Sequence, residues 1–160
     1  MSRAIYPGSF DPVTFGHLDI IKRSSAMFDE VVVGVLNNHA KNPLFSTKER
    51  KEMLEESVKG FGNVEVISFD GLLIDFMRQN DISVIVRGLR AITDFDYELQ
   101  IAQSNRKVSK EKIDTVFLTT SIDYAYLSSS IVREYASYGT DVSDFVPEFV
   151  VRRLKNRFQQ

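Results

Sequence analysis

Short apolar runs alternate along the chain with longer segments whose apolar residues recur at helical spacing. The short runs are rich in β-branched residues and apolar at nearly every position, which is typical of strands buried on both faces of a parallel sheet. They predict five strands, over residues 4–6, 30–36, 64–69, 84–86 and 115–118. A helical pattern follows each of them, so the elements alternate as βα five times.

The helices are predicted from apolar spacing and from residues that begin or end helices. Ser46 opens a capping box, and Thr93 is predicted to cap the longest helix, on which we expect Phe95 to face the core. Gly139 ends the fifth helix, and Pro147 suits the first turn of an extra C-terminal one. The predicted helices cover residues 16–28, 46–59, 71–79, 93–107 and 129–138, with a last one from Pro147.

This alternation predicts the α/β class and a doubly wound, Rossmann-like sheet of five parallel strands with right-handed crossovers. The chain has 160 residues and no linker, repeat or low-complexity segment, so residues 1–160 are expected to form a single domain with an extra C-terminal helix. Open sheets of this kind bind ligands at the carboxyl ends of their strands. The residues that follow each strand are therefore the first candidates for function.

Composition narrows the function classes. Twenty basic and 22 acidic residues give a net charge of −2, which argues against broad binding of nucleic acid but allows a small positive pocket. The chain has no cysteine, which excludes disulfides, thiolate metal sites and cysteine nucleophiles. No apolar run approaches 18 residues, and residues 1–7 are too short and polar for a signal peptide, so no membrane association and a cytoplasmic location are expected.

The loop after the first strand is the first candidate site. It carries two glycines and two prolines between Pro7 and Gly16, which favours a tight loop that a ligand can approach closely. A helix begins near Gly16, and its free N–H groups and dipole favour an anion there. His17 lies in the first turn of this helix; its alternative role is that of a surface or capping histidine. The chain contains neither a P-loop nor a dinucleotide-binding glycine motif.

A polar loop follows the second strand. Lys41 could reach an anion from this loop, although a lone loop lysine is more often only solvated. The sequence identifies no partner for His39, whose role stays unassigned. A metal site formed by His17 and His39 lacks a third ligand at metal spacing, so the metal ligands remain unknown.

Two arginines follow the fourth strand. Arg87 and Arg90 bracket a glycine at the carboxyl end of this strand, and their forked donors suit a phosphate. The alternative is an ion pair with Asp94 or Asp96. Glu98, one turn into the next helix, is either a surface charge or an acceptor for a ligand.

A run of three serines follows the fifth strand. Ser128, Ser129 and Ser130 lead into a helix that carries Arg133, which predicts a second anion cradle; the alternative is an ordinary serine cap. Together the loops predict a pocket for several phosphates at one edge of the sheet. Transfer of a phosphoryl or nucleotidyl group needs mostly positioning and charge neutralisation, and the chain shows no Ser-His-Asp pattern for nucleophilic catalysis.

Four motifs in order resemble a known family. The Thr14-x-Gly16-His17 signature and the serine run 128–130 with its arginine resemble the nucleotidyltransferase superfamily. With the sequence GSFDPVTFGH at 8–17, RGLR at 87–90 and DFDYE at 94–98, the chain resembles the bacterial phosphopantetheine adenylyltransferase family over nearly its whole length.

The resemblance implies an activity and a set of site residues. The activity is the reversible transfer of the adenylyl group of ATP to 4′-phosphopantetheine in coenzyme A synthesis, by direct in-line displacement and with Mg²⁺, giving 3′-dephospho-coenzyme A and pyrophosphate. Catalysis would fall to His17, as stabiliser of the transition state, with Lys41 and Arg90. Phosphopantetheine would be held by Ser9, Lys41, Leu73 and Arg87. ATP would be held by Ser9, Phe10, His17, Gly88, Leu89, Arg90, Glu98, Tyr124, Ala125, Tyr126, Leu127, Ser128, Ser129 and Ser130.

The same resemblance implies a homohexamer and coenzyme A as a feedback inhibitor. Two other interpretations stay open. Another nucleotidyltransferase, such as a glycerol-phosphate cytidylyltransferase, would usually carry histidine where this chain has Thr14. A non-catalytic nucleotide-binding protein on the same fold would lack one of His17, Lys41 or Arg90, and this chain has all three.

Overall fold

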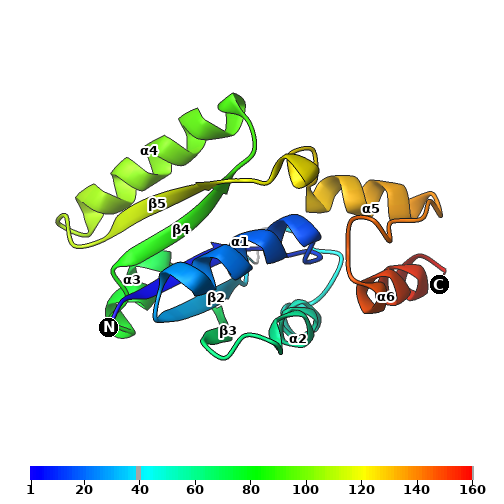
Figure 1. Cartoon of the computed structure of the whole chain (residues 1–160), viewed down its shortest axis with the longest axis horizontal. Helices are drawn as coiled ribbons and strands as arrows, with labels where there is room; N and C mark the ends of the chain where they lie inside the picture. The colour runs from blue at the N-terminus through cyan, green and yellow to red at the C-terminus, as the bar shows by residue number, and fades with distance from the viewer. Residues whose placement is uncertain (39–40, 160) are drawn as a thin grey trace.

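A computed structural model, which describes residues 1–38 and 41–159, contains one five-stranded parallel sheet. The strand order is β3-β2-β1-β4-β5 (Figure 1). β2 and β3 lie on one side of β1, and β4 and β5 lie on the other, so the strand order reverses between β1 and β4. All five predicted strands are confirmed. Their bounds are β1 (Arg3–Gly8), β2 (Glu30–Leu36), β3 (Val64–Phe69), β4 (Val84–Leu89) and β5 (Asp114–Thr119).

Helices cover both faces of the sheet because alternate strand residues are apolar on each face. On one face, Tyr6 and Val33 belong to a core that is completed by the first, second and last two helices. On the other face, Ile5 and Val32 pack against the third helix. The helices are α1 (Phe15–Met27), α2 (Thr47–Val58), α3 (Leu73–Gln79), α4 (Ile92–Val108), α5 (Ser129–Ser137) and α6 (Glu148–Phe158), with a 3₁₀ turn η1 (Ile122–Tyr124) before α5.

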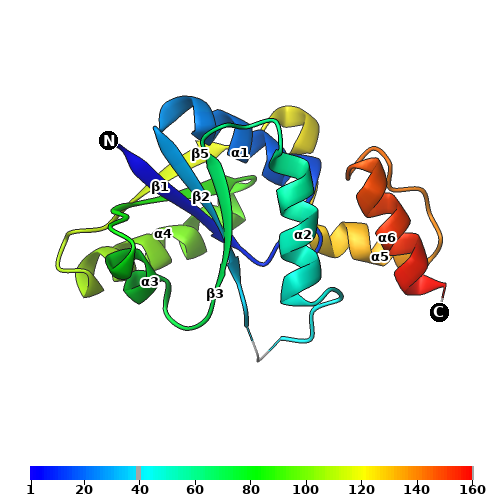
Figure 2. The same cartoon turned by 90° about the horizontal axis from the view of Figure 1, so that it is seen from below.

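Most predicted helix ends are confirmed. Ser46 caps α2 in a capping box with Glu49, and Gly139, at a φ of 76°, directly follows the C-cap of α5. Pro147 is the N-cap of α6 rather than part of its first turn. The extra C-terminal helix lies beside α5, on the side of the molecule away from α4 (Figures 1 and 2).

The predicted start and packing of α4 are wrong. β4 continues through Leu89, and the N-cap of α4 is Ala91, so Thr93 lies inside the helix and does not cap it. Phe95, expected in the core, is 40% exposed. The reason is topological, because α4 packs against β4 and the edge strand β5, at the outer end of the sheet (Figure 1). No described helix is long and apolar enough to cross a membrane.

Candidate active site

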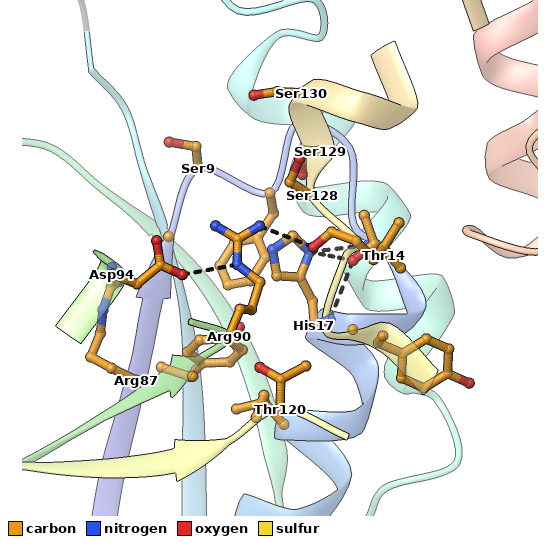
Figure 3. A pocket seen from close by; sticks show the side chains of 18 of the residues that line it. Ser9, Thr14, His17, Arg87, Arg90, Asp94, Thr120, Ser128, Ser129 and Ser130 are labelled. Carbon is orange, nitrogen blue, oxygen red and sulfur yellow. Dashed lines mark hydrogen bonds and ion pairs between the residues drawn. The ribbon is translucent and has the colours of Figure 1, made fainter. Parts of the chain in front are cut away.

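A cavity of about 330 Å³ opens at the carboxyl ends of β1, β4 and β5, next to the point where the strand order reverses (Figure 3). This is where an open α/β sheet is expected to bind its ligand. Its walls come from the β1–α1 loop, the start of α1, the end of β4, the first turns of α4 and the β5–α5 loop. They are lined by Tyr6, Pro7, Gly8, Ser9, Phe10, Asp11, Thr14, Gly16, His17, Ile20, Arg87, Gly88, Arg90, Asp94, Glu98, Thr120, Tyr124, Leu127, Ser128, Ser129, Ser130 and Arg133.

His17 is both a capping residue and a pocket residue. It is the third residue of α1, and the capping box is reciprocal: its backbone N–H donates to Thr14 Oγ1 at 3.3 Å, and the Thr14 backbone N–H donates to His17 Nδ1 at 3.0 Å. A backbone N–H can only donate, so Nδ1 must be the unprotonated nitrogen. The cap therefore leaves the ring proton on Nε2, which is available to a ligand.

The surroundings of His17 keep its ring neutral. Burial, together with the nearby positive charges of Arg90 and Arg87, lowers the pKa of His17 to about 4. The ring also packs against the Phe10 ring, with centroids 4.9 Å apart and planes at 74°. A neutral imidazole at pH 7 donates one hydrogen bond without bringing a charge of its own.

Arg87 is held rigidly at the end of β4. Its Nε and Nη2 donate to the two carboxylate oxygens of Glu98, at 2.9 and 2.7 Å, and its Nη1 donates to the Pro7 carbonyl at 2.8 Å. Burial alone would lower the pKa of Arg87, but the bond and charge of Glu98 outweigh it, so the pKa is raised. The alternative of an ion pair in place of phosphate binding therefore holds for Arg87, although its partner is Glu98 and neither Asp94 nor Asp96.

Arg90 is held from two sides while it faces the cavity. Its Nε lies 3.3 Å from Asp94 Oδ2, and its Nη1 donates to the Leu127 carbonyl at 3.0 Å. Figure 3 shows its guanidinium beside the ring of His17. The ion pair with Asp94 is the one expected as the alternative role, yet the side chain stays 40% exposed and lines the cavity.

Two of the three serines fix the start of α5: one caps the helix and the next joins it to the first loop. Ser128 accepts from the Ile131 backbone N–H, which makes it the N-cap. Ser129 Oγ donates to the Pro12 carbonyl at 2.7 Å, so the N-termini of α5 and α1 are tied together. Arg133 donates to the Asp11 carbonyl at 2.6 Å. Two helix N-termini therefore meet at one cavity, an arrangement that favours anions.

Gly88 allows α1 to pack closely on β4. A Cβ at this position would lie 3.2 Å from Cγ1 of Ile20, tighter than ordinary contacts allow. The glycine between the two arginines thus brings the start of α1, with His17, up to the end of β4.

Five predicted site residues do not line this cavity: Lys41, Leu73, Leu89, Ala125 and Tyr126. Lys41 is exposed in the β2–α2 loop, and Leu73 begins α3 at the end of β3. Tyr126 packs on Phe145, with ring centroids 5.9 Å apart. These residues and the cavity nevertheless lie at the same edge of the sheet, because Leu89 ends β4 and the others follow parallel strands.

The prediction for His39 falls outside the described residues. Among residues 1–38 and 41–159, no cluster of three or more His, Cys, Asp or Glu side chains could hold a metal ion.

Several residues that line the cavity were not predicted as site residues from the sequence. Tyr6 points into the cavity from β1, and burial raises its pKa to about 12. Thr120 follows β5 directly, so the rule that ligands bind at strand ends could have found it. Asp11 belongs to the GSFDPVTFGH motif, which does not show its contacts: its carboxylate is buried and accepts the backbone N–H groups of Leu44 and Phe45.

Comparison with known proteins agrees with this geometry. The cytidylyltransferase-like family model matches residues 5–135. The chain is 56% identical to a phosphopantetheine adenylyltransferase from Lachnoclostridium phytofermentans, covering 99% of this chain and 96% of that one. It is 51% identical to one from Caldanaerobacter subterraneus, covering 100% and 99%. A third, from Thermobifida fusca, is 54% identical, covering 100% and 96%.

The fold is also shared with more distant proteins. A solved structure assigned as a nicotinate-nucleotide adenylyltransferase from Vibrio parahaemolyticus superposes with a TM-score of 0.72 over 100% of this chain and 98% of that one. Its sequence identity is only 17%, so this likeness supports the fold alone. On the strength of the full-length relatives, the chain belongs to the phosphopantetheine adenylyltransferase family of cytidylyltransferase-like nucleotidyltransferases.

Proposed function

We propose that the cavity transfers the adenylyl group of ATP to 4′-phosphopantetheine, giving 3′-dephospho-coenzyme A and pyrophosphate. The observation that carries this is the meeting of the His17 donor, the Arg90 guanidinium and two helix N-termini around one cavity. These groups suit the charge of a triphosphate, and the whole chain resembles relatives named for this reaction.

The reaction is an in-line displacement without a covalent enzyme intermediate. The acceptor is a phosphate monoester, mostly a dianion at pH 7 because its second pKa is about 6, so it needs no general base. One of its oxygens forms a bond to the α-phosphorus of ATP. The bond between that phosphorus and the bridging oxygen breaks, and the electron pair leaves with pyrophosphate. The main barrier is repulsion between two anions, which positive groups in fixed positions reduce.

His17 and Arg90 act on the nucleotide. The Nε2–H of His17 donates to an α-phosphate oxygen, and this bond strengthens as the oxygen gains charge in the transition state. Arg90 is oriented by Asp94 and by the Leu127 carbonyl, so it neutralises the triphosphate at little cost in ordering. The N-terminus of α5, with Ser128 to Ser130, holds the outer phosphates.

The acceptor is held on the other side of the β1 loop. In the proposed arrangement Ser9 orients the attacking phosphate, Lys41 neutralises it, and Leu73 and Arg87 contact the rest of the molecule. Of these, Ser9 and Arg87 line the cavity, and the others lie at the ends of β2 and β3 along the same edge.

Mg²⁺ would be bound chiefly through substrate phosphates. The described residues contain no cluster of metal ligands, and Mg²⁺ commonly uses substrate phosphates and waters in place of an all-protein cage. When bound, it withdraws charge from the phosphate oxygens. We further propose a cytoplasmic homohexamer of single-domain chains, with coenzyme A competing for the acceptor site.

One assay tests the proposal. Protein, ATP, Mg²⁺ and 4′-phosphopantetheine should yield dephospho-coenzyme A and pyrophosphate in equal amounts, while CTP in place of ATP should give far less product. No turnover, or equal turnover with CTP, contradicts the proposed activity.

A further inference from the structure

Arg50 is a buried charge in α2, on a helix that contributes nothing to the cavity lining. The residue is 2% exposed, and its guanidinium donates to three backbone carbonyls. Nη1 donates to the Ser9 carbonyl at 2.7 Å and to the Leu36 carbonyl at 3.2 Å, and Nε donates to the Phe45 carbonyl at 3.1 Å. One side chain therefore joins the loop after β1 to both ends of the loop after β2.

A fourth hydrogen bond of the Arg50 guanidinium begins a chain of bonds that reaches the end of β3. Nη2 of Arg50 donates to Thr47 Oγ1 at 3.0 Å, and Thr47 Oγ1 donates to Asn37 Oδ1 at 2.9 Å. Asn37 Nδ2 then donates to Asp70 Oδ1 at 2.9 Å, and its backbone N–H donates to the Phe69 carbonyl at 3.0 Å. This chain of bonds ends just before α3.

Asp11, in the β1–α1 loop, also binds the end of the β2–α2 loop. Its two carboxylate oxygens accept the backbone N–H groups of Leu44, at 2.8 Å, and Phe45, at 2.9 Å. Arg50 therefore holds Leu36, before Lys41 in the chain, and Arg50 and Asp11 together hold Phe45, after it.

Arg50 directly joins the loop with Ser9 to the loop with Lys41, and through Thr47 and Asn37 it reaches Asp70, shortly before α3. These segments carry or precede the residues proposed to hold the acceptor, namely Ser9, Lys41 and Leu73. The nucleotide side is held by other contacts, namely Thr14 on His17, and Asp94 with Leu127 on Arg90. We infer that Arg50 is a positioning residue for the acceptor substrate, setting where Ser9, Lys41 and Leu73 lie relative to one another; this rests on the proposed function.

The chemistry of Arg50 fits this role better than simple core filling. Burial lowers the pKa of Arg50, with the negative charge of Asp11 opposing, so placing the charge here costs stability that an apolar side chain would not. Among the described residues it has no carboxylate within 4.0 Å, and three of its four bonds go to backbone carbonyls. A planar fork spans these acceptors, whereas a lysine ammonium cannot reach them all.

The test compares two variants with a matched control. Arg50→Lys keeps the charge and loses the fork, and Thr47→Val removes only the hydroxyl that links Arg50 to Asn37. The control is Arg153→Lys, at a half-exposed arginine that pairs with Glu52 across α6 and α2. For each protein we would measure kcat, the KM for 4′-phosphopantetheine, direct ATP binding and the melting temperature.

The expected result is a selective loss. Arg50→Lys should raise the KM for phosphopantetheine about tenfold or more, and Thr47→Val about three- to tenfold, from the loss of bonds that each hold one acceptor segment. The Kd for ATP should stay within about twofold in both variants, and Arg153→Lys should change neither constant.

Each other outcome has a definite meaning. If Lys41→Ala impairs use of phosphopantetheine but Arg50→Lys and Thr47→Val do not, the inference is wrong while the proposed function stands. Equal losses for ATP and phosphopantetheine, or a fall in melting temperature alone, show a merely structural role and overturn it as well. If Arg50→Lys does not fold, Thr47→Val decides. If the unaltered protein makes no dephospho-coenzyme A, the proposed function fails and the inference falls with it.

Discussion

At the scale of single residues, the site depends on one histidine whose proton is placed by its own helix cap. The Thr14 N–H occupies Nδ1 of His17, so the sequence motif Thr-x-Gly-His contains both the donor and the group that sets its tautomer. The motif's position could be predicted from sequence because a strand, a tight loop and a helix start follow one another. The neutral state of the ring could not, because it depends first on burial in the folded chain and then on Arg90 and Arg87, which come from the end of β4.

Replacing His17 by alanine should slow the chemical step. We expect kcat to fall by at least about two orders of magnitude, the usual effect of removing one donor to a developing oxyanion, while ATP affinity changes far less. Steady-state kinetics beside direct ATP titration would check this. If ATP binding collapses while kcat holds, His17 is a ground-state ligand; if the melting temperature collapses, its role is structural.

The lowered pKa of His17 also predicts a pH dependence of stability. The folded ring titrates near pH 4 and the unfolded one near its ordinary value of about 6.5, so between these values the unfolded chain binds more protons. The contribution of His17 to stability is therefore complete above about pH 6.5 and is lost as the pH falls towards 4. Melting curves of the unaltered protein and of His17→Asn should show a smaller loss for the variant across this window. Parallel curves would contradict the neutral, partly buried ring.

Lys41→Ala should affect one substrate more than the other. Loss of a charged hydrogen bond worth about 1.5–3 kcal/mol should weaken use of phosphopantetheine by one to two orders of magnitude. ATP binding should change little, because the lysine lies in the β2–α2 loop outside the nucleotide cavity. Separate titrations with each substrate measure the difference. Equal weakening of both would remove Lys41 from the acceptor site.

At the scale of elements, the ends of a strand could be predicted best where polar residues flank the strand on both sides. β2 and β3 match the predicted bounds because polar residues flank them on both sides, Asp29 and Asn37 for β2 and Asn63 and Asp70 for β3. β1 and β4 run further than predicted, through Pro7-Gly8 and Arg87-Gly88, because parallel neighbours pair with residues that locally favour a turn. The same extension of β4 places the start of α4 at Ala91 and makes the predicted cap at Thr93 wrong.

The anchoring of α4 gives a prediction about stability. None of its described side chains is fully buried, and two ion pairs attach it to the sheet: Glu98 with Arg87 of β4 through two bonds, and the more exposed Arg106 with Asp114 of β5. Glu98→Gln should lower the free energy of unfolding by about 1–3 kcal/mol, the range for a lost charged hydrogen bond in a partly buried setting. Urea unfolding measures this, with Glu134→Gln on the exposed face of α5 as the control. An effect no larger than the control would mean that apolar contacts alone hold α4.

At the scale of the whole molecule, the fold and the edge that carries the site follow from alternation of strands and helices, and both were predicted. The contacts that join the loops along this edge were not. Arg50 and Asp11 bind mainly backbone groups of segments far apart in the chain, and backbone acceptors leave no trace in the types of residue. Side chains that bind side chains or ligands are therefore more visible in a sequence than those that hold loops in place.

The last prediction concerns assembly. α4 leaves Phe95 40%, Tyr97 65% and Val108 56% exposed, and apolar side chains gathered on one element often mark an interface. Together with the family resemblance, this leads us to expect a homohexamer in solution. Sedimentation equilibrium should give a mass near six chains, and the melting temperature should rise with protein concentration because association stabilises the folded chain. A monomer at micromolar concentration that keeps full activity would contradict this and would show that one chain carries a complete site.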